Sequence, residues 1–296
     1  MQRSPGQWID DHAAFVLLTP AVVLLIALVY HPALSSVWNS LHGQVLSLPG
    51  RGAPFVGLDN YRDLLATPVF WRALRTTLLF ATVSVAAELA IGLAIALCLD
   101  GLVRGRGVLR AAVLVPWAIP TVVASQMWRF LWNDRYGPLA YYLFRGDTPL
   151  ASPSGALATI IVADVWKAAP FVALILLAGL QAIPESILQA ARIDGACPWI
   201  RSTRITLPLL KPALVAAFLF RMIDAFRVFD LVFVMTQGRP ADGTDTLQFL
   251  GYRRSFAEGL IWSGAAISTA VFLITLSAAL LYLRAVDSEL WRGERR

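Results

Sequence analysis

Residues 189–208 read QAARIDGACPWIRSTRITLP and lie between two long apolar runs. They contain a pair of alanines, a glycine four positions later and an Ile-x-Leu-Pro ending. Glycine reaches backbone conformations that other residues rarely adopt, and proline is tolerated in the first turn of a helix. We therefore expect a short helix before Gly195, a turn at Gly195 and a second short helix from Pro198 that leads into the next apolar run. Both short helices are expected to lie across a membrane surface.

The chain as a whole is too apolar for a soluble domain. Of its 296 residues, 57% are hydrophobic and 15% are charged, and the mean hydropathy is +0.64. The apolar residues form runs of about 20, which is long enough to cross a bilayer, and backbone groups in lipid must bond internally, so the runs are expected to be helices. We predict an all-α membrane protein with six transmembrane helices, at about 13–35, 74–99, 109–132, 156–180, 209–235 and 261–283.

The distribution of basic residues predicts the orientation of these spans. Lys and Arg near the span ends are more concentrated on one side, which is the cytoplasmic side by the positive-inside rule. That side holds both termini and residues 189–208. The expected location is therefore the inner or plasma membrane, as a multi-pass protein with both termini in the cytoplasm.

Several classes of function lack their usual motifs. The net charge of +6 comes from scattered arginines without a basic tract interleaved with aromatics, so no nucleic-acid partner is expected. The three histidines lack metal-binding spacing, and Cys98 and Cys197 stand alone. The sequence has neither a P-loop nor a G-x-S-x-G motif. We therefore predict a non-enzymatic protein with no catalytic residue and no metal site.

Residues 189–208 resemble the cytoplasmic loop of importer-type ABC permeases, whose pattern is E-A-A-x3-G-x9-I-x-L-P, and the spacing matches at every step. The sequence Asp194-Gly-Ala196 extends the likeness to sugar permeases of the maltose and glycerol-3-phosphate type. Phe55-Val-Gly-Leu-Asp-Asn-Tyr61 is similar to a segment that often precedes their core. The resemblance covers about residues 55–285 and implies a type I ABC importer permease fold.

The resemblance implies a function and a set of partners. The chain would form half of the path for a di- or oligosaccharide and would couple to an ATPase. Its partners would be a second homologous permease, two copies of a P-loop ATPase, an external solute-binding protein, the sugar and the lipid bilayer. ATP and Mg would bind the ATPase, and this chain would bind no cofactor.

The residues that the resemblance assigns to ATPase docking lie within 185–208. Gln189 stands where the family most often has Glu. Glutamine keeps the hydrogen-bonding capacity of glutamate but lacks its charge. Glu185, one turn earlier, could supply a carboxylate. The predicted docking residues are Glu185, Gln189, Ala190, Ala191, Asp194, Gly195, Ile205, Leu207 and Pro208.

Three segments are expected along the chain. Residues 1–54 would hold the first span and an outer loop. Residues 55–285 would form the permease core, with five spans and a cytoplasmic coupling loop at 182–208. Residues 286–296 would be a cytoplasmic tail.

The predicted spans also contain charged residues, which are costly in a membrane and usually face a cavity or each other. Arg221, Asp224, Arg227 and Asp230 recur every three residues along the fifth span, and Glu88 in the second span is expected to be structural. The residues proposed for the substrate path are Asp164, Trp166, Lys167, Asp224, Phe226, Arg227 and Asp230. Whether these charges form a gate or hold helices in register is left open by the sequence.

Two other functions would also suit a membrane protein of this size. A stand-alone secondary transporter driven by an ion gradient predicts inverted repeats and discontinuous spans. A membrane-embedded transferase predicts an acidic metal motif or a histidine cluster. The sequence shows no convincing repeat and no such motif, and neither function explains residues 189–208.

Overall fold

The computed structural model describes residues 15, 17–43, 54–101, 105–145 and 147–293, and every long element among them is a helix. The chain divides into two compact units. The first unit comprises Met1–Thr67 and Gly251–Ala270, and the second comprises Pro68–Leu250 and Val271–Arg296. The predicted segment boundaries at residues 54 and 285 are not tested by this division and stay predictions.

The described residues contain five unbroken helices that are long and apolar enough to cross a membrane, and one bent pair that makes a sixth span if counted as one. The five helices are Leu17–Ser40, Pro68–Asp100, Pro153–Gln181, Pro198–Phe226 and Ile261–Arg284. The predicted all-α architecture with six spans is therefore confirmed, with corrections to the third and fifth spans.

The third span is not the single helix that we predicted at 109–132. It consists of α5 (Arg106–Ala118) and α6 (Thr121–Leu131), and the two parts meet at an angle of 84°. Pro120 has no N–H to continue the helix, and the residue before a proline favours an extended backbone. Ile119 accordingly has φ −69° and ψ 130°. The bend leaves backbone groups without helical partners at the break.

The fifth span also differs from the predicted range of 209–235. One helical stretch runs from Pro198 to Phe226 through α10 (Pro198–Ile200), η3 (Arg201–Thr206) and α11 (Leu207–Phe226). The expected second short helix is thus the beginning of this span and not a separate element. The stretch ends at Phe226, and the chain becomes helical again at α12 (Asp230–Met235).

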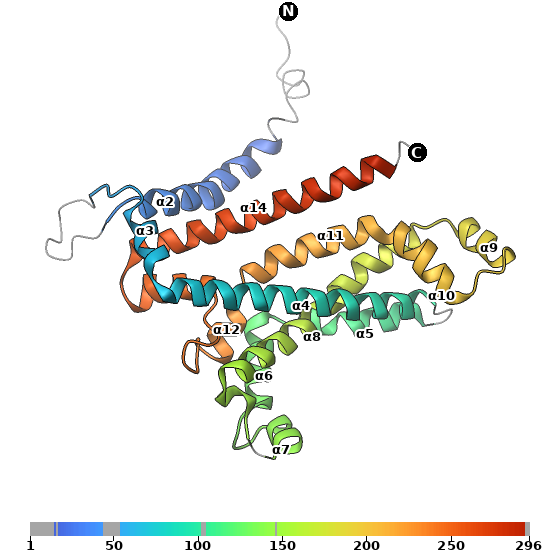
Figure 1. The fold of residues 1–296 in the computed structure, drawn as a ribbon, viewed down its shortest axis with the longest axis horizontal. Coiled ribbons are helices and arrows are strands. Elements are labelled where there is room, and N and C mark those ends of the chain that lie inside the picture. The colour runs from blue at the N-terminus through green and yellow to red at the C-terminus, as the bar shows by residue number, and fades with distance from the viewer. Residues whose placement is uncertain (1–14, 16, 44–53, 102–104, 146, 294–296) are drawn as a thin grey trace, which may run out of the picture. The chain divides into compact units, whose positions relative to one another are not determined.

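The core of the second unit lies where α4 (Pro68–Asp100), α8 (Pro153–Gln181) and α11 pack together (Figure 1). A side chain at Gly92 of α4 would meet α8, because a Cβ atom there would lie 2.6 Å from Cγ1 of Val172. Glycine therefore allows close approach of these two spans. The buried residues of this core are Ala96, Leu99, Val172, Leu176, Leu177, Leu180, Leu210 and Ala217.

Shorter elements complete the second unit. The helices α7 (Pro138–Phe144) and η2 (Pro149–Ala151) lie between α6 and α8, and α9 (Glu185–Ile193) follows α8. The chain leaves this unit within α13 (Leu247–Tyr252) and passes through η4 (Arg253–Ala257) of the first unit to α14 (Ile261–Gly293). The helix α14 belongs to the first unit up to Ala270 and to the second from Val271. In Figure 1, α9 and α10 form a projection at one end of the packed spans of the second unit.

The first unit shows what the segment at residues 55–61 does. Its helices include η1 (Ile26–Tyr30), α2 (His31–Ser40) and α3 (Asp59–Ala66). The side-chain amide of Asn60 donates hydrogen bonds to the carbonyl oxygens of Ser40 (2.7 Å) and His42 (2.8 Å). The Tyr61 and Ser40 hydroxyls are also bonded, at 2.6 Å. These contacts satisfy carbonyl groups at the end of α2, which would otherwise lack partners.

Candidate functional site: a docking turn and an intramembrane cavity

The turn after α9 is a Schellman motif. The N–H of Gly195 donates to the carbonyl of Arg192 at 3.1 Å, and the N–H of Ala196 donates to the carbonyl of Ala191 at 3.0 Å. Gly195 has φ +76°, in the left-handed region that favours glycine at this position. The predicted turn at Gly195 is therefore present, and the Asp-Gly-Ala sequence is its structural basis.

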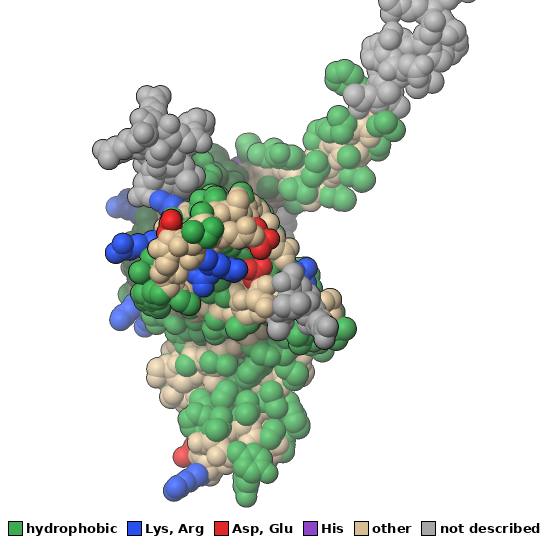
Figure 2. All heavy atoms as spheres, turned by 90° about the vertical axis from the view of Figure 1, so that its right-hand side faces the viewer, with side chains coloured by type: hydrophobic (Ala, Val, Ile, Leu, Met, Phe, Trp, Pro, Cys, Tyr) green, Lys and Arg blue, Asp and Glu red, His purple; other side chains and the backbone are tan. Residues whose placement is uncertain are grey.

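The projection formed by α9 and α10 exposes both polar and apolar side chains. Glu185 and Gln189, one helical turn apart, are exposed, whereas Ala191 is buried. Two large apolar side chains are also exposed, Ile193 at 86% and Trp199 at 77%. Figure 2 looks onto this end of the unit, where acidic and basic side chains gather around apolar ones. Such a surface has the chemistry of a protein-binding site.

A second site lies inside the span region, where two helix breaks meet. A cavity of about 250 Å³ is lined by Trp117 and Thr121, on either side of the break in the third span. It is also lined by Arg227, Val228 and Phe229, at the break after α11. Non-helical backbone at membrane depth is tolerated only where it is buried in protein or lines a cavity. The two breaks and the cavity are therefore parts of one arrangement.

Lys167 of α8 satisfies backbone groups at the first break. Its amine donates to the carbonyl oxygens of Trp117 (3.1 Å) and Ile119 (2.8 Å). These carbonyls lie at the carboxyl end of α5, where a positive charge is favourable because of the helix dipole. Trp117 also stacks on Phe171, with ring centroids 5.4 Å apart. Lys167 and Phe171 thus fix one wall of the cavity against α8.

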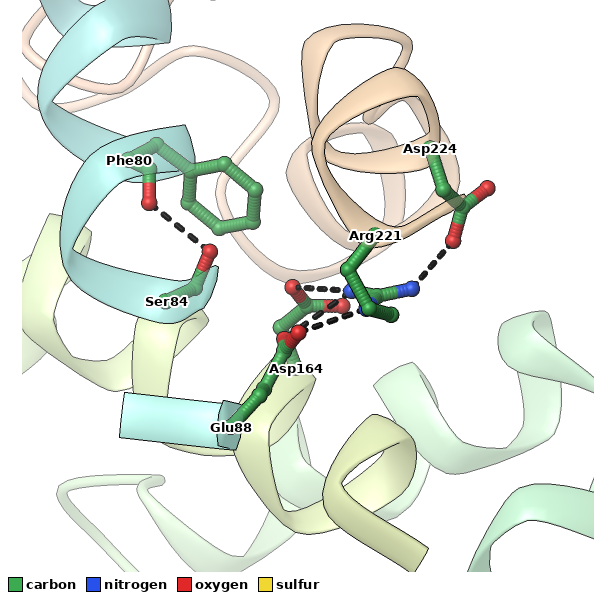
Figure 3. A network of polar contacts seen from close by, with 6 residues as sticks. All are labelled: Phe80, Ser84, Glu88, Asp164, Arg221 and Asp224. Carbon is green, nitrogen blue, oxygen red and sulfur yellow. Dashed lines mark hydrogen bonds and ion pairs between the residues drawn. The ribbon is translucent and has the colours of Figure 1, made fainter. Parts of the chain in front are cut away.

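At the wall of the cavity, Arg221 of α11 ties three helices together (Figure 3). Its Nε and Nη2 atoms donate to the two oxygens of Glu88 on α4, at 2.5 and 2.9 Å. Nη2 also donates to Asp164 of α8 at 3.1 Å, and Nη1 donates to Asp224. Glu88 is fully buried, whereas the side chain of Asp224 is 73% exposed. The cluster therefore reaches from the packed core to the cavity.

The structure brings together five of the seven residues proposed for the substrate path. Asp164, Lys167, Asp224, Arg227 and Asp230 all line the cavity. Trp166 and Phe226 lie outside its lining, because Trp166 packs edge-on against Trp128 and Phe226 is buried. The part that each residue plays in transport stays a prediction.

Three lining residues that carry much of this site were not proposed for the path from the sequence, namely Trp117, Thr121 and Arg221. Arg221 was noted in the charged stripe of the fifth span, but its partners on other helices cannot be read from that spacing. Trp117 and Thr121 lie beside Pro116 and Pro120, and these prolines indicate that the third span could break and border a cavity.

The described residues contain no candidate metal site, since no group of three or more of their His, Cys, Asp and Glu side chains is arranged to hold a metal ion. The carboxylates of the cavity region are instead held by a guanidinium group. The expectation that the chain itself binds no cofactor stays a prediction.

Residues 88–288 match the family described as "Binding-protein-dependent transport system inner membrane component". The chain belongs to this family. It is therefore an inner membrane component of a transport system that depends on a binding protein, and it contains several membrane-spanning helices.

Relatives of this inner membrane component are similar along nearly their whole length. The trehalose/maltose transport system permease protein MalF of Thermococcus litoralis is 41% identical, over 91% of this chain and 92% of the relative. The trehalose transport system permease protein SugA of Mycobacterium tuberculosis is 38% identical, over 99% of this chain and 94% of the relative. Both are named as permease proteins, which confirms the predicted non-catalytic transport role.

A solved structure shares the fold. The crystal structure of a bacterial ABC transporter involved in the import of the acidic polysaccharide alginate superposes with a TM-score of 0.82. The sequence identity is 20%, and the match covers 95% of this chain and 98% of that chain. The predicted fold of an ABC importer permease is therefore confirmed. The alternative of an ion-coupled secondary transporter has no support.

Proposed function

We propose that this permease imports a sugar through the intramembrane cavity and is coupled to its ATPase through residues 185–208. The cavity carries the proposal, because carboxylates, cations and an aromatic ring converge where two spans are interrupted. Sugars are recognised by charge-assisted hydrogen bonds to their hydroxyl groups and by apolar contact with aromatic rings. The names of the relatives, which refer to trehalose and maltose, support a sugar substrate.

We propose that residues 185–208 dock on the ATPase. The Schellman turn at Gly195 ends α9 just before the start of the fifth span, and the exposed Ile193 and Trp199 give the projection an apolar surface. Gln189 and Glu185 lie one turn apart on α9 and are both exposed. A carboxylate is thus present on the same face as Gln189, where the family pattern has Glu.

The complete transporter would contain a second, homologous permease and two ATPase copies. Each permease would present one docking turn to one ATPase, and each would contribute half of the path. ATP and Mg would be bound by the ATPase, and an external solute-binding protein would deliver the sugar. Both termini would lie in the cytoplasm, because six spans return the chain to its starting side and basic residues favour that side.

The charged cluster would serve both roles that the sequence left open, because it would hold helices in register and also contribute to the substrate path. The ion pairs of Arg221 with Glu88 and Asp164 join three spans, which favours a role in register. Asp224 and Lys167 reach the cavity, which favours a role in the path. Asp224→Ala should therefore lower sugar uptake while the complex still assembles. Loss of assembly would show that Asp224 serves register alone.

The experiment that tests the proposed function is uptake of radiolabelled trehalose or maltose into proteoliposomes. The vesicles would contain the complex of this chain with its second permease and ATPase, with the binding protein added outside. We expect uptake that requires ATP inside the vesicle and is lost when the P-loop lysine of the ATPase is replaced. Uptake driven by a proton or sodium gradient without ATP would contradict the proposal and favour the secondary transporter.

A further inference from the structure

The lining of the cavity carries as many carboxylates as cations. Its cations are Lys167, Arg221 and Arg227, and its carboxylates are Asp164, Asp224 and Asp230. Behind this lining, Glu88 pairs with Arg221 and is fully buried. The site therefore has four carboxyl groups for three cations.

The two less exposed cations have little hydrogen-bonding capacity left for a solute. A guanidinium group has five N–H donors, and Arg221 directs four of them to Glu88, Asp164 and Asp224. Lys167 directs two of its three donors to backbone carbonyls. Neither can offer the two-pronged contact by which basic side chains hold carboxylates, sulfonates or phosphates.

The carboxylates, by contrast, remain available to a solute. The side chain of Asp224 is 73% exposed although one of its oxygens accepts from Arg221. Asp230 begins α12 and lines the same cavity. An ionised carboxylate accepts hydrogen bonds through two oxygens, so it suits the hydroxyl groups of a neutral sugar. It repels a solute that is itself an anion, and this repulsion is strong where little water is present.

We infer that this cavity selects neutral sugars against acidic ones, with Glu88, Asp164, Asp224 and Asp230 acting together as a charge filter. The inference rests on the proposed sugar transport and adds the substrate class. It separates this chain from the structural relative whose substrate is the acidic polysaccharide alginate. It also gives the buried Glu88 a task beyond packing, since Glu88 takes two N–H donors of Arg221 that an acidic sugar could otherwise use.

The experiment compares two sugars that differ only at one carbon. Methyl glucoside carries CH₂OH at C6, and methyl glucosiduronate carries a carboxylate there. Their affinities for the purified transporter complex, without the solute-binding protein, can be measured by titration with saturation-transfer-difference NMR. We expect the wild-type complex to bind methyl glucoside at least about tenfold more tightly than methyl glucosiduronate. This ratio corresponds to a difference of about 1.4 kcal/mol in binding free energy.

Two variants connect the selectivity to this chain. Asp224→Asn removes a carboxylate from the Arg221 cluster, and Asp230→Asn removes one that makes no ion pair among the described residues. Each should strengthen the binding of glucosiduronate by about 0.7 kcal/mol. The preference for methyl glucoside should then fall to about threefold or less. Asp230→Asn keeps the test valid if Asp224→Asn does not fold. Asp134→Asn, at an exposed position outside the cavity, should leave the preference unchanged.

Each contrary result has its own meaning. Equal affinity of the wild type for the two sugars, or a preference that neither variant changes, would overturn the charge filter and leave the proposed sugar import standing. Failure of both sugars to bind would also overturn the filter. In that case the uptake experiment, in which the binding protein delivers the sugar, still decides the proposed function independently.

Discussion

The docking turn and the intramembrane cavity are organised over very different distances along the chain. At the turn, the hydrogen bonds of Gly195 and Ala196 reach residues three and five positions away. At the cavity, Arg221 pairs with Glu88 and Asp164, which are 133 and 57 positions away. A local motif can be recognised from residue spacing, whereas a long-range ion pair depends on how whole helices pack. The two regions should accordingly differ in how they respond to substitution.

The largest effect is expected from Arg221→Ala. It leaves the buried Glu88 without its cation, and breaking a buried ion pair in this way costs about 3–5 kcal/mol. Thermal unfolding of the purified complex would measure the loss. Arg254→Ala removes one partner of an exposed ion pair with Glu258 and should cost less than about 1 kcal/mol. Similar losses for the two variants would contradict the structural importance of the cluster.

A smaller loss is expected from Lys167→Met. It removes the charge-assisted hydrogen bonds of a partly buried amine to the carbonyls of Trp117 and Ile119, and we expect the two together to contribute about 1.5–3 kcal/mol. Hydrogen exchange of the backbone around Thr121 should increase, since the break in the third span loses its support. Lys167→Arg keeps the charge and should retain most of the protection. Unchanged exchange in the methionine variant would show that the break is held by other contacts.

A substitution in the docking turn should reduce sugar uptake more than it reduces the stability of the protein. Gly195→Val forces a β-branched residue into a left-handed conformation at a cost of about 1–2 kcal/mol, and nothing lies near its Cβ position to clash. We expect the protein to reach the membrane while ATP-dependent uptake falls about tenfold. Gly195→Asn is the matched control, because asparagine tolerates this conformation. Normal uptake by the valine variant would show that coupling to the ATPase does not depend on the conformation of this turn.

The smallest effect is expected from Gln189→Glu, which restores the residue usual in the family pattern. Both Gln189 and Glu185 are exposed, and an exposed ion pair contributes about 0–1 kcal/mol. The affinity for the ATPase should therefore rise by about fivefold or less, as measured by titration of the purified ATPase. A larger gain would show that Glu185 does not replace the missing carboxylate.

The sequence predicted most of the fold because long apolar runs and the bilayer thickness together determine the number of spans. It also placed the turn at Gly195, since the conformation of that residue is set by its immediate neighbours. The helix breaks were harder to predict. Pro120 interrupts the third span, but Pro170 lies inside the unbroken α8 and Pro212 inside α11. Proline alone therefore does not decide where a membrane helix breaks.

The candidate path was only partly predictable for a related reason. Spacing along one helix placed Asp224 and Arg227 near each other, and the structure adds the break after Phe226 that brings Asp230 to the same cavity. The partner of Glu88 lies on another helix, so no pattern within the second span could identify it. Trp166 and Phe226 fit the chemistry of sugar binding, but packing against other parts of the unit turns them away from the cavity lining.

The continuous helix from Pro198 to Phe226 has a mechanical consequence. Trp199 beside the docking turn and Arg221 in the buried cluster lie 22 residues apart on it, which is about 33 Å at 1.5 Å per residue. On a rod of that length, a tilt of about 5° at one end moves the other by about 3 Å, as much as one hydrogen bond spans. A small rotation imposed at the Trp199 end would therefore be enough to uncouple Arg221 from Glu88, with no unfolding between them.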